Sequence, residues 1–239
     1  NGVVTMNGGE ISSNIAMTQG RGKWAAYGGG IYVKSGSLFI NGGQIINNTA
    51  DSDVDYYQED AYGGGIYIAA GSVILNDGRI SGNTAGTVSF PNSDGGGIFV
   101  GDECTFIMNG GEISNNTALK KGGGICIGED QPSASDKVQL IAGTISGNHA
   151  KTGGGIYVSL ESELALERVV IAGNTAYTGG GAWSCAYGKG YFYATRSGFL
   201  SGNSADRRGG DFNSLSQNKN SILHFASRLH NGKLVRWYQ

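Results

Sequence analysis

The clearest pattern in the chain is an alternation of hydrophobic and polar positions that recurs at fixed distances before an asparagine. The reference asparagines are Asn14, Asn48, Asn83, Asn116, Asn148, Asn174 and Asn203. Three residues before each of them stands an isoleucine, or a leucine in the last copy, and most copies are also hydrophobic eight and ten residues before it. Alternation with a period of two is typical of β-strands that bury one face. The pattern therefore predicts short strands with one buried side in every copy.

A second phrase, three glycines followed by a short hydrophobic run, alternates with the asparagine phrase. It begins at Gly28, Gly63, Gly95, Gly122, Gly153 and Gly179, and it weakens to Gly209-Gly210. The shortest distance between successive repeat asparagines is 26 residues, from Asn148 to Asn174. That length suits one coil of a parallel β-helix, whereas the chain lacks the period of helical repeats and a propeller blade needs about 40 residues.

These repeats predict an all-β, single-domain parallel β-helix with one coil per repeat, about seven coils in all. Its hand should be right, because parallel crossover connections are almost always right-handed. Stacking should place the repeat asparagines in an amide ladder along one turn. A partial second column precedes a glycine turn and consists of Asn7, Asn41, Asn76 and Asn109. We interpret the repeat asparagines as structural.

Composition narrows the class further. Hydrophobic residues make up 39% of the 239 residues, which indicates a packed core, and 44 glycines without a three-residue period exclude collagen. The net charge of −2 gives no reason to expect nucleic acid as a partner. Cys104, Cys126 and Cys185 have no metal-ligand spacing, so we expect buried free thiols. No apolar run approaches the ~20 residues of a membrane span, and a start at Asn1 within a repeat suggests a piece of a longer parent chain.

Insertions gather in one slot of consecutive repeats. Three long segments, 17–27, 51–62 and 86–94, separate an asparagine phrase from the next glycine phrase, whereas later copies have short connections there. Insertions on one face of a solenoid commonly form its binding face, so these three loops should meet as one lateral patch.

The repeat phrases stop near Phe212. We predict a repeat array over residues 1–212 and a C-terminal capping segment over residues 213–239, because an open solenoid end would expose strand edges and core.

The two phrases together resemble the repeats of chlamydial polymorphic outer-membrane proteins, which carry GGAI-type and FxxN-type tetrapeptides. The matching positions are Gly29-Gly30-Ile31 with its copies and Ile-x-x-Asn at 11–14 with its copies, over about residues 10–212. Glycine replaces the family's alanine, and isoleucine replaces its phenylalanine. The resemblance implies a β-helix in an adhesin-like bacterial protein that is extracellular or at the cell surface. Such a segment would be a non-enzymatic stalk or binding scaffold that contacts glycan or host protein.

An enzyme is the alternative, since many β-helix proteins are polysaccharide lyases or glycoside hydrolases. In that case Asp53 and Asp60 would be the catalytic carboxylates, acting as an acid and a nucleophile or base. The residue set typical of polygalacturonases is absent from this sequence, as are a nucleophile elbow and zinc-ligand spacing.

The same acidic loop could hold calcium. Asp51, Asp53 and Asp55 have the offsets of calcium ligands, but Tyr56 stands where an EF-hand has its turn glycine. An irregular calcium site therefore remains open, beside a solvated acidic loop with no ligand.

Aromatic residues form two candidate binding surfaces. The three inserted loops would bring together Trp24, Tyr27, Tyr56, Tyr57, Tyr62 and Phe90. The position after each glycine-isoleucine step would form an outward strip of Tyr32, Tyr67, Phe99, Cys126, Tyr157, Trp183 and Phe212. Rings on successive coils stand about 4.8 Å apart. Such a strip is either a platform for glycan or protein, or a ladder that stabilises the sheet.

Overall fold

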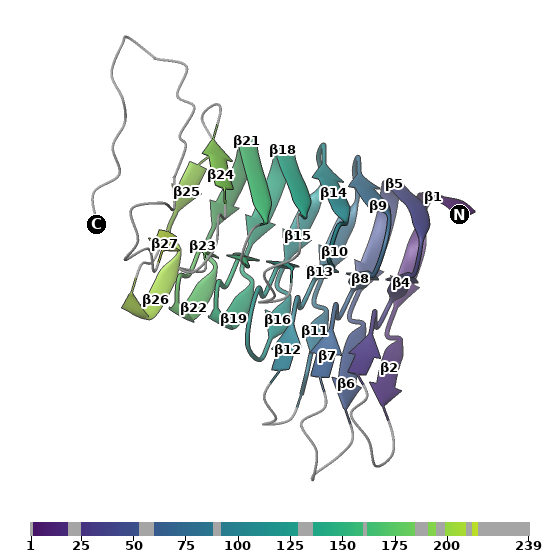
Figure 1. Ribbon diagram of the computed structural model, residues 1–239, viewed down its shortest axis with the longest axis horizontal. Helices are drawn as coiled ribbons and strands as arrows, with labels where there is room; N and C mark the ends of the chain where they lie inside the picture. The colour runs from purple at the N-terminus through teal and green to yellow at the C-terminus, as the bar shows by residue number, and fades with distance from the viewer. Residues whose placement is uncertain are drawn as a thin grey trace.

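The computed structural model is a parallel β-solenoid in which strands of successive repeats lie side by side along the long axis (Figure 1). It describes residues 2–18, 25–52, 60–87, 92–128, 136–159, 162–184, 191–194, 199–208 and 212–214. The chain is all-β over these residues, and none of them belongs to a helix long and apolar enough to cross a membrane. The predicted fold class, a parallel β-helix, is confirmed.

The largest sheet carries the strands that lead up to each repeat asparagine. Its ten strands are β1 (Gly2–Ser12), β5 (Gly36–Ile46), β9 (Ser72–Leu75), β10 (Arg79–Ser81), β14 (Thr105–Met108), β15 (Glu112–Ser114), β18 (Lys137–Ser146), β21 (Glu163–Ala172), β24 (Tyr191–Ala194) and β25 (Phe199–Ser201).

A second sheet follows the asparagines. It consists of β2 (Ile15–Thr18), β6 (Thr49–Ser52), β11 (Thr84–Ala85), β16 (Thr117–Ala118), β19 (His149–Thr152), β22 (Thr175–Thr178) and β26 (Ser204–Arg208). Beside it lies a three-stranded sheet of β3 (Ala25–Tyr27), β7 (Asp60–Tyr62) and β12 (Asn92–Asp94).

The last sheet follows the glycine phrases. Its strands are β4 (Ile31–Val33), β8 (Ile66–Ile68), β13 (Ile98–Val100), β17 (Ile125–Ile127), β20 (Ile156–Val158), β23 (Ala182–Ser184) and β27 (Phe212–Ser214).

Every strand pairing in the described residues is parallel and joins equivalent positions of neighbouring repeats. Ile45 pairs with Ile80, which pairs with Ile113, and that column continues through Ile145 and Ile171. This register follows from the period of two, because a one-residue slip would move every buried isoleucine to the outer face.

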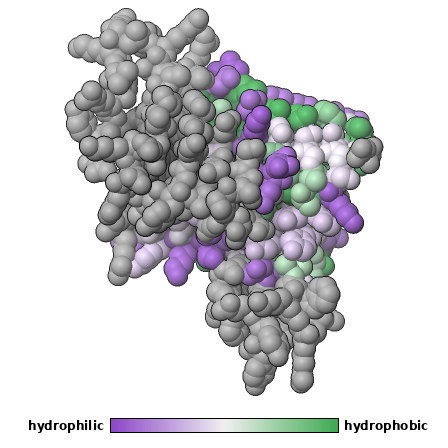
Figure 2. Space-filling view, viewed as in Figure 1, coloured by the Kyte–Doolittle hydropathy of each residue, from purple (hydrophilic) through white to green (hydrophobic). Residues whose placement is uncertain are grey.

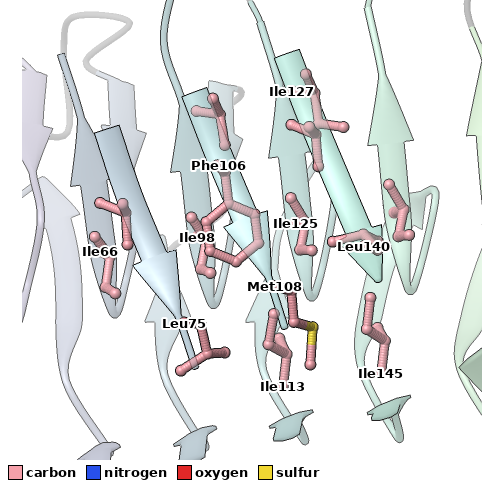
Figure 3. Close-up of a cluster of buried hydrophobic side chains, with 14 of the residues drawn as sticks. Ile66, Leu75, Ile98, Phe106, Met108, Ile113, Ile125, Ile127, Leu140 and Ile145 are labelled. Carbon is pink, nitrogen blue, oxygen red and sulfur yellow. The ribbon is translucent and has the colours of Figure 1, made fainter. Parts of the chain in front are cut away.

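The core is one continuous cluster along the solenoid interior. Side chains from the largest sheet and from the sheet after the glycine phrases meet there, among them Ile66, Leu75, Ile98, Phe106, Met108, Ile113, Ile125, Leu140 and Ile145 (Figure 3). All nine are completely buried. The predicted hydrophobic columns are therefore the core, with Leu140 and Ile145 inside it as expected.

The number of coils is slightly smaller than the repeats predict. The solenoid makes about five turns. In the second sheet β6, β11, β16, β19 and β22 pair on both sides, whereas β2 and β26 each pair on one side within the described residues. The first and last copies of the repeat thus form the ends of the stack and are not enclosed turns.

Candidate functional site

The corner at each repeat asparagine is built by a buried amide ladder. From Asn14 to Asn174, the backbone N–H and Nδ2 of each ladder asparagine donate to Oδ1 of the asparagine in the next coil. Asn83, for example, donates to Asn116 at 2.9 and 3.0 Å. Nδ2 also donates to a carbonyl of the preceding coil, in this case that of Ile45 at 2.9 Å. The predicted amide ladder is confirmed.

The residue before the ladder asparagine has left-handed backbone. Its φ is +56° at Asn47, +66° at Gly82 and +55° at Asn115. Glycine and asparagine adopt this conformation most readily. The phrase therefore reads Asn-Asn or Gly-Asn in most copies, because the turn constrains the residue before the ladder as well as the ladder residue.

The glycine triplet packs directly against this ladder. A Cβ atom on Gly96 would overlap the carbonyl oxygen of Thr117, and one on Gly97 would lie 2.9 Å from Nδ2 of Asn116. Real side chains do not approach backbone this closely. The two repeat phrases occur together because the glycines leave the space that the asparagine ladder occupies.

Two outward rows of side chains flank the glycine triplets. The row before the glycines contains Tyr27, Tyr62, Asp94, Lys121 and Thr152 in backbone register. The row after them contains Tyr32, Tyr67, Phe99, Cys126 and Tyr157, and the backbone register continues to Trp183. The two rows face each other across the glycine turn, so side chains predicted to belong to separate surfaces lie together.

Five rings from these rows form one aromatic cluster. Tyr27 stacks on Tyr32 and on Tyr62, with centroid distances of 5.9 and 5.8 Å, and its ring lies 4.6 Å from that of Tyr67. Phe99 stacks on Tyr67 at 5.3 Å and contacts Tyr62 at 4.8 Å. Stacked and tilted rings at such distances attract each other by about 0.5–1.5 kcal/mol beyond the area they bury.

Exposure within the cluster changes along the solenoid axis. Tyr32 and Tyr27 are 48% and 38% exposed, whereas Tyr67 is 8% exposed and Phe99 is fully buried. Further along the row, Cys126 and Tyr157 are buried as well, and the Lys121 ammonium lies 4.9 Å from the centroid of Tyr157. The predicted strip is therefore not a continuous open platform, and among its described side chains the exposed ring is that of Tyr32, at the N-terminal end.

One assignment to the strip is wrong. Phe212 pairs with Ala182, and Asn213 occupies the position opposite Trp183. Asp211 stands where earlier copies have the third glycine, so Phe212 takes the place of Ile31 in the neighbouring column. Of the inserted-loop patch, Tyr27 and Tyr62 are adjacent. Trp24, Tyr56, Tyr57 and Phe90 lie outside the described residues.

The predicted acidic residues have structural partners where the structure describes them. Both carboxylate oxygens of Asp51 accept hydrogen bonds from Thr87 of the next coil, through its backbone N–H and its hydroxyl. Oδ2 of Asp60 accepts from the Tyr62 hydroxyl at 3.0 Å, and Oδ1 of Asp60 is buried without a hydrogen bond. Asp53 and Asp55 lie outside the described residues. In the part of the chain that the structure describes, no three His, Cys, Asp or Glu side chains are grouped so that they could hold a metal ion.

A buried polar cluster that the sequence did not reveal lies at another corner. Asp136, Ser159 and Ser162 are fully buried, and the Ser162 hydroxyl donates to Oδ2 of Asp136 at 2.9 Å. Burial raises the pKa of Asp136 to about 6, against the lowering effect of the Ser162 hydrogen bond. Nothing in the sequence distinguishes these residues from other loop-end serines and aspartates.

The expected free thiols are confirmed for two cysteines. Cys104 and Cys126 are buried and carry thiol side chains, and Cys185 lies outside the described residues. Burial, with Asp136 and Asp102 nearby, raises the pKa of Cys104 to about 12. A thiol that stays protonated is a poor nucleophile, so Cys104 acts as a core residue.

Among known families, residues 110–128 match the model of the Chlamydia polymorphic membrane protein repeat. These repeats are similar to those of chlamydial polymorphic membrane proteins. No curated protein and no solved structure matches the chain. The family match points to a segment of an outer-membrane or surface protein.

The matched span contains one asparagine phrase and one glycine phrase, and each of them packs against a neighbouring coil. It holds Asn116, which packs against Gly97 of the preceding glycine phrase, and Gly124, which packs against Asn148 of the following coil. The likeness to polymorphic membrane protein repeats therefore covers the residues that determine how one coil stacks on the next.

Proposed function

We propose that this segment is a non-enzymatic binding scaffold of a bacterial surface protein and that it contacts glycan through the exposed end of its aromatic cluster. The observation that carries the proposal is the pair Tyr27 and Tyr32, which stack at 5.9 Å and are 38% and 48% exposed. Sugar rings bind well to exposed aromatic faces when polar groups nearby accept hydrogen bonds from their hydroxyls. The phenol oxygens of Tyr27 and Tyr32 supply such groups.

Rigidity supports the same function. Tyr27 and Tyr32 contact Tyr62 and Tyr67, whose strands are paired on both sides. A preorganised ring loses little conformational freedom when it binds, so more of the contact energy is available for affinity. The inserted loops would extend this surface with Trp24, Tyr56, Tyr57 and Phe90, and calcium bound by Asp51, Asp53 and Asp55 would order the acidic loop.

The test is a glycan-array screen of the full chain, followed by titration of the strongest hits. Alanine at both Tyr27 and Tyr32 should weaken binding about tenfold or more, equivalent to about 1.4 kcal/mol. Tyr177→Ala is the matched control, because Tyr177 has the same 38% exposure but lies on β22 in another sheet.

Unchanged binding by the double variant would place the glycan elsewhere. If the array gives no hits, the aromatic end should instead be screened against host surface proteins, and binding there would replace glycan with protein as the ligand. In either case Trp24→Ala and Tyr57→Ala show whether the inserted loops contribute to the same surface.

A further inference from the structure

Tyr62 and Asp60 form a hydrogen-bonded pair inside the aromatic cluster. Both residues lie on β7, and the Tyr62 hydroxyl donates to Oδ2 of Asp60 at 3.0 Å. Oδ1 of the same carboxylate is buried and receives no hydrogen bond, so no donor competes for the carboxylate at that oxygen. A phenol whose proton already points at a carboxylate has a base in place to receive that proton.

The ring of Tyr62 contacts three other aromatic rings. Its centroid lies 5.8 Å from that of Tyr27, 6.2 Å from that of Tyr67 and 4.8 Å from that of Phe99. Tyr27 and Tyr62 are direct partners in the parallel register of β3 and β7, and their ring planes differ by 18°. These contacts join coils within the described chain, so they hold whatever precedes the first coil.

A hydrogen-bonded carboxylate and a neighbouring phenol ring together suit one-electron oxidation. A tyrosine that loses only an electron becomes a strongly acidic radical cation, so its oxidation is easier when the phenolic proton leaves in the same step. At Tyr62 the proton would move to Oδ2 of Asp60 along the existing hydrogen bond, while the electron goes to the oxidant. The neutral radical that remains would lie against the ring of Tyr27, a second phenol with which it can combine.

We propose that Tyr62 is a redox-active tyrosine with Asp60 as its proton acceptor, and that its radical couples with that of Tyr27 to form a dityrosine cross-link between neighbouring coils. Two one-electron oxidants of the peroxyl-radical class each take one electron, one from Tyr62 and one from Tyr27. The resulting peroxide anions take up the two phenolic protons, that of Tyr62 by way of Asp60. A carbon–carbon bond then forms between the ring carbons next to the two phenol oxygens. The hydrogens on those carbons move to the oxygens, which restores both phenols.

The cross-link would join β3 to β7 in the three-stranded sheet beside the main solenoid. A covalent bond between adjacent strands restricts the unfolded chain, so the oxidised protein should resist unfolding of these coils. Hydrophobic, neutral and hydrophilic residues are interspersed on the coloured part of the face in Figure 2, so a water-soluble oxidant can approach the molecule there. Glycan binding is not required for this chemistry, which uses ring contacts and a hydrogen bond and not exposed ring faces.

The experiment oxidises the dilute full chain with photoexcited tris-bipyridyl ruthenium and persulfate, which remove single electrons from tyrosine. Dityrosine fluorescence gives the rate of coupling, and the mass of the monomer should fall by that of two hydrogen atoms. Peptide mapping then locates the bond, and we expect Tyr27 joined to Tyr62. Tyr62→Phe keeps the ring and should abolish this cross-link. No dityrosine, or dityrosine at other pairs without the bond between Tyr27 and Tyr62, would overturn the proposal.

Asp60→Asn tests the role of the proton acceptor. The amide oxygen still accepts a hydrogen bond but does not take the proton, so dityrosine formation should slow about tenfold or more. Raising the phosphate concentration should restore the rate in this variant, because the buffer then takes the proton, and should leave the parent rate unchanged. Asp77→Asn is the matched control, since Asp77 is an exposed acid between β9 and β10, and it should oxidise like the parent. Equal rates, or equal responses to phosphate, in Asp60→Asn and the parent would refute proton transfer to Asp60, and circular dichroism confirms that the variants are folded.

Discussion

Replacing Asn116 with alanine tests how much the buried amide ladder contributes to stability. Nδ2 of Asn116 donates to Oδ1 of Asn148 at 3.0 Å and to the carbonyl of Ile80 at 2.9 Å. Its Oδ1 accepts from the N–H and Nδ2 of Asn83 at 2.9 and 3.0 Å. Asn116, Asn83 and Asn148 are each fully buried, so water cannot replace these bonds without opening the coil.

The expected loss follows from the groups left without a partner. In the alanine variant the carbonyl of Ile80, the N–H of Asn83 and one Nδ2 hydrogen of Asn83 lose theirs. Oδ1 of Asn148 keeps the backbone N–H of residue 116, which donates at 2.9 Å. Each buried unsatisfied group costs about 1–3 kcal/mol. We expect the free energy of unfolding to fall by about 3–5 kcal/mol. This value is near the lower end of the sum for the three groups, because a solenoid can open locally and admit water.

The matched control is Asn76→Ala in the exposed ladder. Asn76 also donates to one asparagine and accepts from another, both at 2.7 Å, but at the surface. Water replaces exposed partners, so we expect a loss of less than about 1 kcal/mol. Urea denaturation measures both values, and hydrogen exchange shows whether the Asn116 variant opens only the coils around β11, β15 and β16. Similar losses in both variants would refute the assignment of stability to burial of the ladder.

Two further predictions concern the core and the buried carboxyl. Leu140→Ala should lower the free energy of unfolding by about 2–5 kcal/mol because Leu140 is fully buried, whereas Gln139→Ala on the outer face should have little effect in the same urea titration. The pKa of Asp136 is raised to about 6 from 3.8, so the folded state binds more protons between these values and stability should fall as pH rises through that window. Asp136→Asn should remove this pH dependence and should be more stable than the parent above pH 6. Thermal melts from pH 4 to 8 measure both proteins. A parent protein whose stability rises between pH 4 and pH 6 would contradict the idea that ionising the buried Asp136 is costly.

The sequence by itself determined the repeat, the strands and the core. Residues such as Ile45 and Ile80 recur at fixed distances from an asparagine with a period of two, and each coil must place equivalent residues above one another. The pairing of the glycine and asparagine phrases was also visible. Its reason, that Gly97 leaves space for Asn116, needed the coordinates.

The tertiary structure alone decided which outward residues are accessible. A period of two says that Tyr67 and Phe99 point away from the core, but not that Tyr62 covers them from across the glycine turn. The turn brings together residues that are not neighbours on one strand, so the described parts of the two predicted aromatic surfaces merge, and Tyr27 and Tyr32 are the most exposed of the five rings in the cluster. Asp136 became buried for a similar reason, because its surroundings come from Ser159 and Ser162 of another connection. Local periodicity determines the direction in which a side chain points. Its exposure to solvent depends on which residues the turns bring over it.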